Sequence, residues 1–232
     1  MSDVVSLEII DNIAIVTVDS PPVNAINQAI REGLLSAFQQ FDLDDDAHAI
    51  VLMCAGKTFM AGADMKEFDA PIEEPGYHET YNRIESCIKP VIAILHGTAL
   101  GGGLEAALAC HYRAAASSAR MGLPELSLGI IPGAGGTQRL PRLIGAKPAL
   151  EFIMGVAPVG ADKALEMGMI DHVIDNDLKA GALDYAKSLL AAGSGPRPTR
   201  DMEVDSTGYT DEFLADIRAI AAKRLRGQKA PE

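Results

Sequence analysis

Two short apolar runs, rich in β-branched residues, open the chain. VVSLEII and IAIVTV lie within residues 4–18 and are separated by Asp11 and Asn12, so this pattern predicts a β-hairpin. Apolar residues at helical spacing follow in QAIREGLLSAFQQF, which predicts an amphipathic helix. Pro21 and Pro22 lie between the two, and proline disrupts a strand, so we expect a loop there.

Further along, continuous apolar runs alternate with helical patterns. AIVLMC at 49–54, PVIAIL at 90–95 and IDHVID at 170–175 each predict a buried strand. Strands separated by helical segments need crossover connections, which predicts an α/β fold with a largely parallel sheet covered on both faces. The last third of the chain has helical patterns at 146–155, 161–168, 177–192 and 211–226.

Length and composition set the organisation. The chain has 232 residues, of which 48% are hydrophobic, enough for one sizeable core. We expect a catalytic core at 1–192, a linker-like loop at 193–210 that is rich in Gly, Pro and charge, and a C-terminal helix at 211–232 leading to an absent region.

The net charge and the cysteine content indicate which partners and which compartment to expect. The net charge of −12 disfavours nucleic acid or an anionic membrane as the partner, because both need a basic face. No apolar run reaches the roughly 18 residues of a membrane span, and no export signal is visible. The three cysteines show no CxxC spacing, which favours reduced thiols and a cytoplasmic location.

The stretch LHGTALGGGLEAALAC, directly after a predicted strand, carries the first candidate chemistry. A Gly-rich turn lets the backbone approach a ligand, and the first amides of the following helix are unpaired, so together they can hold developing negative charge. Neither GK[ST] nor GxGxxG is present, which disfavours a nucleotide phosphate cradle. Two interpretations of Glu105 stay open: a reactive carboxylate, or a solvated first-turn glutamate stabilised by the helix dipole.

Two further stretches add to this site. GKTFMAGADMKEF at 56–68 also follows a predicted strand, Asp64 can cap the helix after it, and free amides are expected near Ala63. Turns after parallel strands meet at one sheet edge. Glu125 follows Pro124 in an apolar segment, where a carboxyl pKa should rise. The alternative is that Glu125 is merely exposed at a loop edge.

In MAGADMKEF, HGTALGGGLE and GLPELSLGIIPGAGGTQRLPRLIG, in that order, the chain resembles the enoyl-CoA hydratase/isomerase (crotonase) superfamily. The similarity is greatest to the N-terminal hydratase part of bifunctional hydratase/3-hydroxyacyl-CoA dehydrogenase proteins of β-oxidation. The resemblance implies a spiral core of ββα repeats with a shortened helical C-terminal region. It also implies an acyl-CoA thioester as substrate and no metal or redox cofactor.

The resemblance also assigns site residues. It implies that the main-chain N–H groups of Ala63 and Gly102 form an oxyanion hole and that Glu105 and Glu125 hold the reacting water. Relatives that only isomerise a double bond keep the PE glutamate and lack the other, so hydration of trans-2-enoyl-CoA is favoured here. The expected substrate-binding residues are Ala61, Gly62, Asp64 and Gly101, with Lys57 and Lys66 near the CoA phosphates.

Alternatives to hydration remain. The chain could be a Δ3,Δ2-enoyl-CoA isomerase or have dual activity, or it could be a non-catalytic acyl-CoA-binding module. Single-domain relatives continue past the point that matches residue 226, and bifunctional relatives continue into a dehydrogenase domain. We therefore expect either a homo-oligomer, in this family a trimer, or a missing C-terminal dehydrogenase domain.

Overall fold

The computed structural model describes residues 4–67 and 71–224 and contains one large and one small sheet. The large sheet has six strands in the order β1-β2-β3-β4-β6-β9. β1 and β2 form the predicted antiparallel hairpin, and all other neighbours are parallel. The strands are β1 (Val5–Ile10), β2 (Ile13–Val18), β3 (Ala49–Cys54), β4 (Val91–Leu95), β6 (Tyr112–Ala116) and β9 (His172–Ile174).

The small sheet has three short strands in the order β5 (Thr98–Leu100), β7 (Arg120–Gly122) and β8 (Val159–Gly160). Each of β4 and β6 is followed by one of these short strands, so successive units contribute one strand to each sheet and then a helical segment. An isolated bridge between Met60 and Ala99 extends the same arrangement to the turn after β3. The predicted ββα repeat is confirmed, and its turns gather at one edge of the large sheet.

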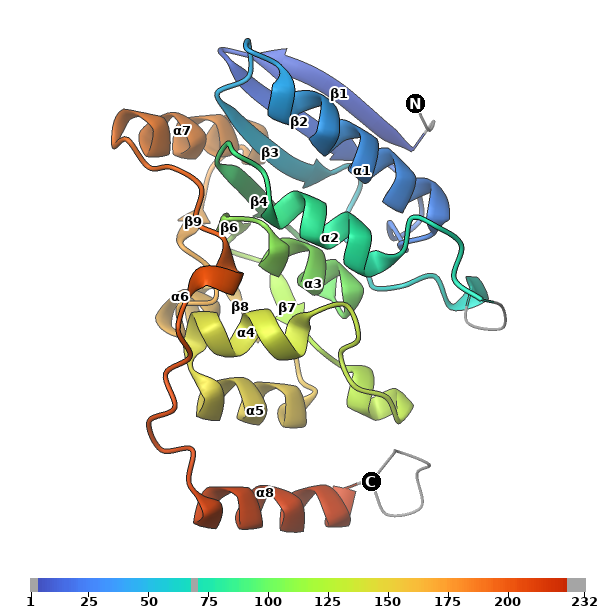
Figure 1. Ribbon diagram of the computed structural model, residues 1–232, viewed down its shortest axis with the longest axis vertical. Helices are drawn as coiled ribbons and strands as arrows, with labels where there is room; N and C mark the ends of the chain where they lie inside the picture. Colours follow the sequence, from blue (N-terminus) through green and yellow to red (C-terminus); the bar gives the residue numbers. More distant parts are fainter. Residues whose placement is uncertain (1–3, 68–70, 225–232) are drawn as a thin grey trace.

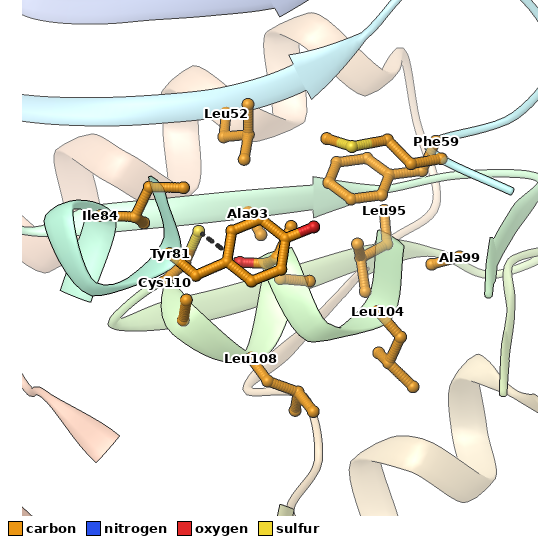
Figure 2. Packing of buried hydrophobic residues seen from close by; sticks show 14 of the residues in the cluster. Leu52, Phe59, Tyr81, Ile84, Ala93, Leu95, Ala99, Leu104, Leu108 and Cys110 are labelled. Carbon is orange, nitrogen blue, oxygen red and sulfur yellow. Dashed lines mark hydrogen bonds between the residues drawn. The ribbon is translucent and has the colours of Figure 1, made fainter. Parts of the chain in front are cut away.

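Helices cover both faces of the large sheet (Figure 1). α1 (Gln28–Leu43), α2 (Tyr77–Glu85) and α3 (Gly102–Ala109) lie side by side on one face, and α7 (Leu178–Ala191) covers the other. The central strands β3 and β4 are apolar throughout because successive side chains point to opposite faces and both faces are buried there. Figure 2 shows the cluster beneath α2 and α3, where helix side chains meet Leu52, Ala93 and Leu95 from the strands.

The remaining α-helices follow after residue 135, and three short 3-10 helices are spread along the chain. They are α4 (Gly136–Ile144), α5 (Ala146–Gly155), α6 (Ala161–Glu166) and α8 (Asp211–Arg224), with short 3-10 helices η1 (Met65–Glu67), η2 (Glu125–Leu128) and η3 (Thr199–Asp201). Five of the helices, α1, α5, α6, α7 and α8, lie where the helical patterns predicted them. The part of the predicted C-terminal helix at 225–232 lies outside the described residues. Over residues 4–67 and 71–224, the structure has no helix with the length and apolarity that a membrane crossing requires.

The segment at 193–210 has linker composition, yet its first half packs on the core. Thr199 is fully buried, and its hydroxyl donates to the Leu108 carbonyl of α3 at 3.3 Å. The Tyr112 hydroxyl of β6 donates to the Gly195 carbonyl at 2.9 Å. α8 then stands apart from the sheets, with Lys147 over the Phe213 ring at 5.1 Å (Figure 1).

Arg113 of β6 is a fully buried charge at the C-terminal end of α3. Its side chain has 0% exposure and pairs with Asp171 at 3.5 Å. The guanidinium donates to the carbonyls of Cys110 at 2.7 Å and Met169 at 2.8 Å. The carbonyls at the end of a helix have no partner within the helix, so this side chain satisfies them and fastens α3 to the segment before β9.

We therefore expect Arg113→Met to lower the free energy of unfolding by about 2–6 kcal/mol, because the Cys110 and Met169 carbonyls each lose a buried donor at a cost of about 1–3 kcal/mol, while Asp171 keeps its ion pair with Arg197. Urea unfolding measures the change. Arg120→Met is the matched control: Arg120 is exposed and donates to the Pro158 carbonyl, so its loss should cost no more than about 0.5 kcal/mol. Equal small losses in both variants would contradict the role given to Arg113.

Candidate active site

A cavity of about 720 Å³ opens where the turns after the parallel strands meet. Its volume is within the range of small-molecule sites, roughly 300–1,000 Å³. The structure brings seven predicted residues to this cavity: Ala61, Gly62, Ala63, Gly101, Gly102, Glu105 and Glu125. Other lining residues include Tyr77 and His78 of α2, Leu128 at the end of η2, and Ile130, Ile131 and Ala134 in the loop after it.

The turn after β3 presents the amide of Ala63. The residues on either side of Ala63 are hydrogen-bonded to the main chain of Ile26. The Ile26 N–H donates to the Gly62 carbonyl at 2.8 Å, and the Asp64 N–H donates to the Ile26 carbonyl at 2.9 Å. Between them the Ala63 N–H has no main-chain acceptor among the described residues. The Asp64 carboxylate accepts from the Lys66 N–H at 3.0 Å and so caps η1.

The Gly-rich turn before α3 presents the second amide. Gly101 has φ +51°, a region that favours glycine, and from there the chain turns into the helix at Gly102. A Cβ on Gly103 would lie 2.2 Å from the Met60 carbonyl oxygen, so only glycine allows α3 to pack on that backbone. The Gly102 N–H is the first of the helix and has no main-chain acceptor in the described part of the chain.

The two free amides are neighbours. A Cβ placed on Gly102 would lie 3.6 Å from the Ala63 nitrogen, and both residues line the same cavity. The buried Tyr81 hydroxyl donates to the Gly102 carbonyl at 2.8 Å and holds this first turn of α3 from below. Two preorganised N–H groups that open on one cavity can stabilise an oxyanion.

Glu105 is buried with 2% exposure, so the interpretation of it as a solvated first-turn glutamate is wrong. Its Oε1 accepts from the Ala134 N–H at 2.8 Å and the Gly136 N–H at 2.7 Å. These amides belong to the turn that leads into α4, a helix that the sequence pattern did not predict, and Gly136 is the first residue of that helix. The carboxylate therefore lies at the N-terminal end of a second helix, where negative charge is stabilised.

Glu125 begins η2 directly after Pro124 and has 8% exposure, so it is not an exposed loop-edge residue. A Cβ on Gly101 would lie 3.2 Å from Glu125 Oε1, which places this carboxyl against the turn that carries Gly102. Within residues 4–67 and 71–224, its buried Oε2 has no hydrogen-bond partner. One oxygen of Glu125 is therefore free to exchange a proton with a ligand.

The two carboxyls have different environments. Burial raises the pKa of Glu125 to about 7, and the Glu105 charge adds to the rise. Burial also raises the pKa of Glu105, but the Gly136 and Ala134 amides and then the positive charges of Arg139 and His78 act against it. Hydrogen bonds to a carboxylate favour its charged form, so Glu105 is the better base and Glu125 the better acid.

The predicted CoA contacts are less well placed. Lys57 and Lys66 are exposed, and neither they nor Asp64 line the cavity. Their contact with CoA phosphates stays a prediction. In the described residues, no group of three or more His, Cys, Asp or Glu side chains is arranged to hold a metal ion.

Residues 8–196 match the Enoyl-CoA hydratase/isomerase family, and the chain belongs to this family. It is 40% identical to the peroxisomal bifunctional enzyme of Danio rerio over 224 residues. This alignment covers 95% of this chain and 31% of that protein. It is 43% identical over 194 residues to the probable enoyl-CoA hydratase of Bacillus subtilis (strain 168), covering 81% of this chain and 74% of the relative. The predicted family, with its likeness to bifunctional proteins, is confirmed.

Solved structures agree with the fold. The enoyl-CoA hydratase from Bacillus anthracis is 32% identical, with a TM-score of 0.75 and coverage of 98% of this chain and 92% of that one. Pseudomonas aeruginosa DspI is 30% identical, with a TM-score of 0.76 and coverage of 97% and 91%. The predicted crotonase-like fold is confirmed. The chain spans about a third of the length of the bifunctional relative, 31%.

The raised pKa of Glu125 predicts a pH-dependent stability. The native state keeps a proton on Glu125 up to a pKa of about 7, whereas the unfolded chain releases it near 4.5. Stability is therefore lost as pH rises through this window. Glu125→Gln removes the cost of ionising a buried carboxyl. At pH 8.5 the variant should therefore be more stable than the parent by roughly 3 kcal/mol, and this difference in stability should shrink towards zero by pH 4.5.

Urea unfolding at several pH values measures this gap. Glu151→Gln, at an exposed position on α5, is the control and should change stability by about 0.5 kcal/mol or less at every pH. A gap for Glu125→Gln that does not vary with pH would show that Glu125 does not keep its proton in the folded protein.

Proposed function

We propose that this chain hydrates trans-2-enoyl-CoA to 3-hydroxyacyl-CoA in fatty acid β-oxidation. One observation carries the proposal: two buried carboxyls of unequal basicity and two free main-chain amides line one cavity. Hydration needs a base for water, an acid for Cα and a site for enolate charge, and this cavity offers all three. The name of the relative from Bacillus subtilis, probable enoyl-CoA hydratase, supports the same reaction.

In the proposed mechanism the thioester oxygen accepts hydrogen bonds from the N–H groups of Ala63 and Gly102, which draws electron density from Cβ. Glu105 takes a proton from water as the water oxygen bonds to Cβ. The enolate charge is held by the two amides, and Glu125 delivers its proton to Cα. The sum is addition of one water across the double bond, and the Glu105 proton returns to Glu125 through exchange with solvent. No step uses a metal or a redox cofactor.

Isomerisation of a 3-enoyl-CoA is a second candidate activity, and the state of Glu125 favours it. A carboxyl with a pKa of about 7 and an unpartnered oxygen can both take and return a proton at neutral pH. Moving a double bond needs one proton removed from C2 and one added at C4, and a single carboxyl can do both. The same oxyanion site would hold the dienolate.

Glu105→Gln separates the two activities. We expect hydration of crotonyl-CoA to fall by about 10²–10⁴-fold, because the amide keeps the acceptor for Ala134 and Gly136 but cannot take a proton. Some isomerisation should remain. The measurements are the loss of conjugated enoyl-thioester absorbance and the shift of a 3-enoyl-CoA double bond.

Glu125→Gln is the companion variant and should lower both activities. Normal hydration by Glu105→Gln would disprove the role of the base. Binding of CoA esters by the parent protein, without any change in absorbance, would instead support the non-catalytic binding module.

Gly102→Pro tests the oxyanion donor. Proline suits the first position of a helix, so α3 should form, but the N–H is gone. Loss of one such donor costs about 3 kcal/mol of transition-state stabilisation, so kcat for hydration should fall roughly a hundredfold or more.

Gly102→Ala is the matched control, because it keeps the N–H and its Cβ would meet neighbours at 3.5–3.6 Å, an ordinary contact. The comparison is made on kcat, with circular dichroism to verify folding. Equal kcat values for the two variants would argue against a hydrogen bond from Gly102.

A further inference from the structure

Arg139 of α4 is a buried charge outside the cavity that contacts the turn holding Glu105. Its side chain has 6% exposure and lies in a network between α2 and α4. Nη2 donates to Glu85 Oε2 at 2.8 Å and to Asn82 Oδ1 at 2.9 Å, and Nε donates to Glu85 Oε2 at 3.2 Å. The remaining nitrogen, Nη1, donates to the Ala134 carbonyl at 3.1 Å.

The Ala134 contact connects this network to the proposed base. The carbonyl of Ala134 faces Arg139, while its N–H donates to Glu105 Oε1. Between the two donors of Glu105 lies Gly135, with φ +110°, where a Cβ would lie 2.2 Å from Arg139 Nη1. The guanidinium thus packs directly on the turn, and the turn can follow this path only with glycine at its centre.

The ion pair of Arg139 and Glu85 has a further partner at the Glu85 end. Glu85 has 2% exposure, and its second oxygen accepts from the Arg200 N–H at 2.9 Å. The ion pair is therefore held by α2, α4 and η3 together, and its position does not depend on solvent. Because several partners hold the Arg139 guanidinium, it keeps a fixed orientation and orients the Ala134 carbonyl that it binds. A flexible surface charge would not do so.

We infer that Arg139 is a positioning residue: it holds the 134–136 turn so that the two amides meet the ionised carboxylate of Glu105. This inference rests on the proposed hydration, in which Glu105 is the base. Arg139 does not line the cavity, so it acts through the turn and through its charge, and substrate binding is left to other groups.

Other titratable groups also face Glu105. His78 and Tyr81 come from α2, and Glu125 comes from η2. The positive charges of Arg139 and His78 lower the pKa of Glu105, against its burial. Burial raises the pKa values of Tyr81 and Glu125, and the Glu105 charge adds to the rise. Removing Arg139 should therefore make Glu105 harder to ionise, both by loosening its two donors and by removing a cation.

The test is the pH profile of kcat/KM for hydration of crotonyl-CoA. Arg139→Gln alone leaves Glu85 buried without its partner, so the double variant Glu85→Gln/Arg139→Gln, which replaces an ion pair with two amides, protects the fold. We expect its acid limb to move up by roughly one pH unit, so that activity falls about tenfold more at low pH than above pH 8. KM should change little.

Arg142→Gln is the matched control on the same helix, since that guanidinium donates to the Gln138 carbonyl and should leave the profile in place. A double variant that loses the same factor at every pH, or loses nothing, would overturn the inference, because a merely structural role would not move the acid limb.

A ¹³C NMR titration of the Glu105 carboxyl gives a readout without activity. A higher Glu105 pKa in the double variant supports the inference, and an unchanged pKa overturns it. If the parent protein fails to hydrate any enoyl-CoA, the proposed function fails, and the titration still decides the role of Arg139.

Discussion

The first turn of α3 lies directly on the main chain of the turn after β3, and both halves of the site depend on this contact. Gly103 allows it, because any side chain there would overlap the Met60 carbonyl. Gly101 allows the abrupt entry into the helix. As a result Gly102 lies next to Ala63, and the helix that starts with a free amide also carries Glu105 one turn later. A single close approach thus positions an oxyanion donor and a carboxylate together.

The two carboxyls gain their different properties from their neighbours. Glu105 lies between two amides at the start of α4 and near a fixed guanidinium, whereas Glu125 keeps an oxygen without a partner in the described structure. Burying an unpartnered acid costs stability, and such costs are typical of functional sites. The same asymmetry separates the base from the acid, so the chemistry and the stability cost have one physical origin.

The sequence predicted the elements whose apolar patterns are strong. The hairpin at 4–18, the strand at 49–54 and the helix at 146–155 lie where their patterns placed them. It missed α2, whose sequence is largely polar, and β6, whose alanines have low strand propensity. It also missed α4, which begins with glycines and contains Pro141. These elements form because they pack on neighbours, and a local pattern does not carry that information.

The site residues likewise divide into those that local sequence predicted and those whose partners only the fold brings together. Local turn chemistry pointed to free amides near Ala63 and in the Gly-rich turn before the helix, and the family resemblance then selected Ala63 and Gly102. The apolar neighbours of Glu125 pointed to its raised pKa. The partners of Glu105 could not be predicted, because its amide donors lie 29 and 31 residues further along the chain. The pairing of Arg139 with Glu85 spans 54 residues and likewise has no local signal. Contacts of this length are set by the fold, so only the structure reveals which groups support the carboxylate.

A crystal structure of the protein with an unreactive enoyl-CoA thioester analogue tests the central claim most directly. Oxyanion donors lie about 2.7–3.1 Å from the oxygen that they stabilise. We expect the thioester oxygen within this distance of both the Ala63 and the Gly102 nitrogen, with the double bond between the Glu105 and Glu125 carboxyls. A thioester oxygen that contacts neither nitrogen, with the acyl chain outside the cavity, would contradict the account.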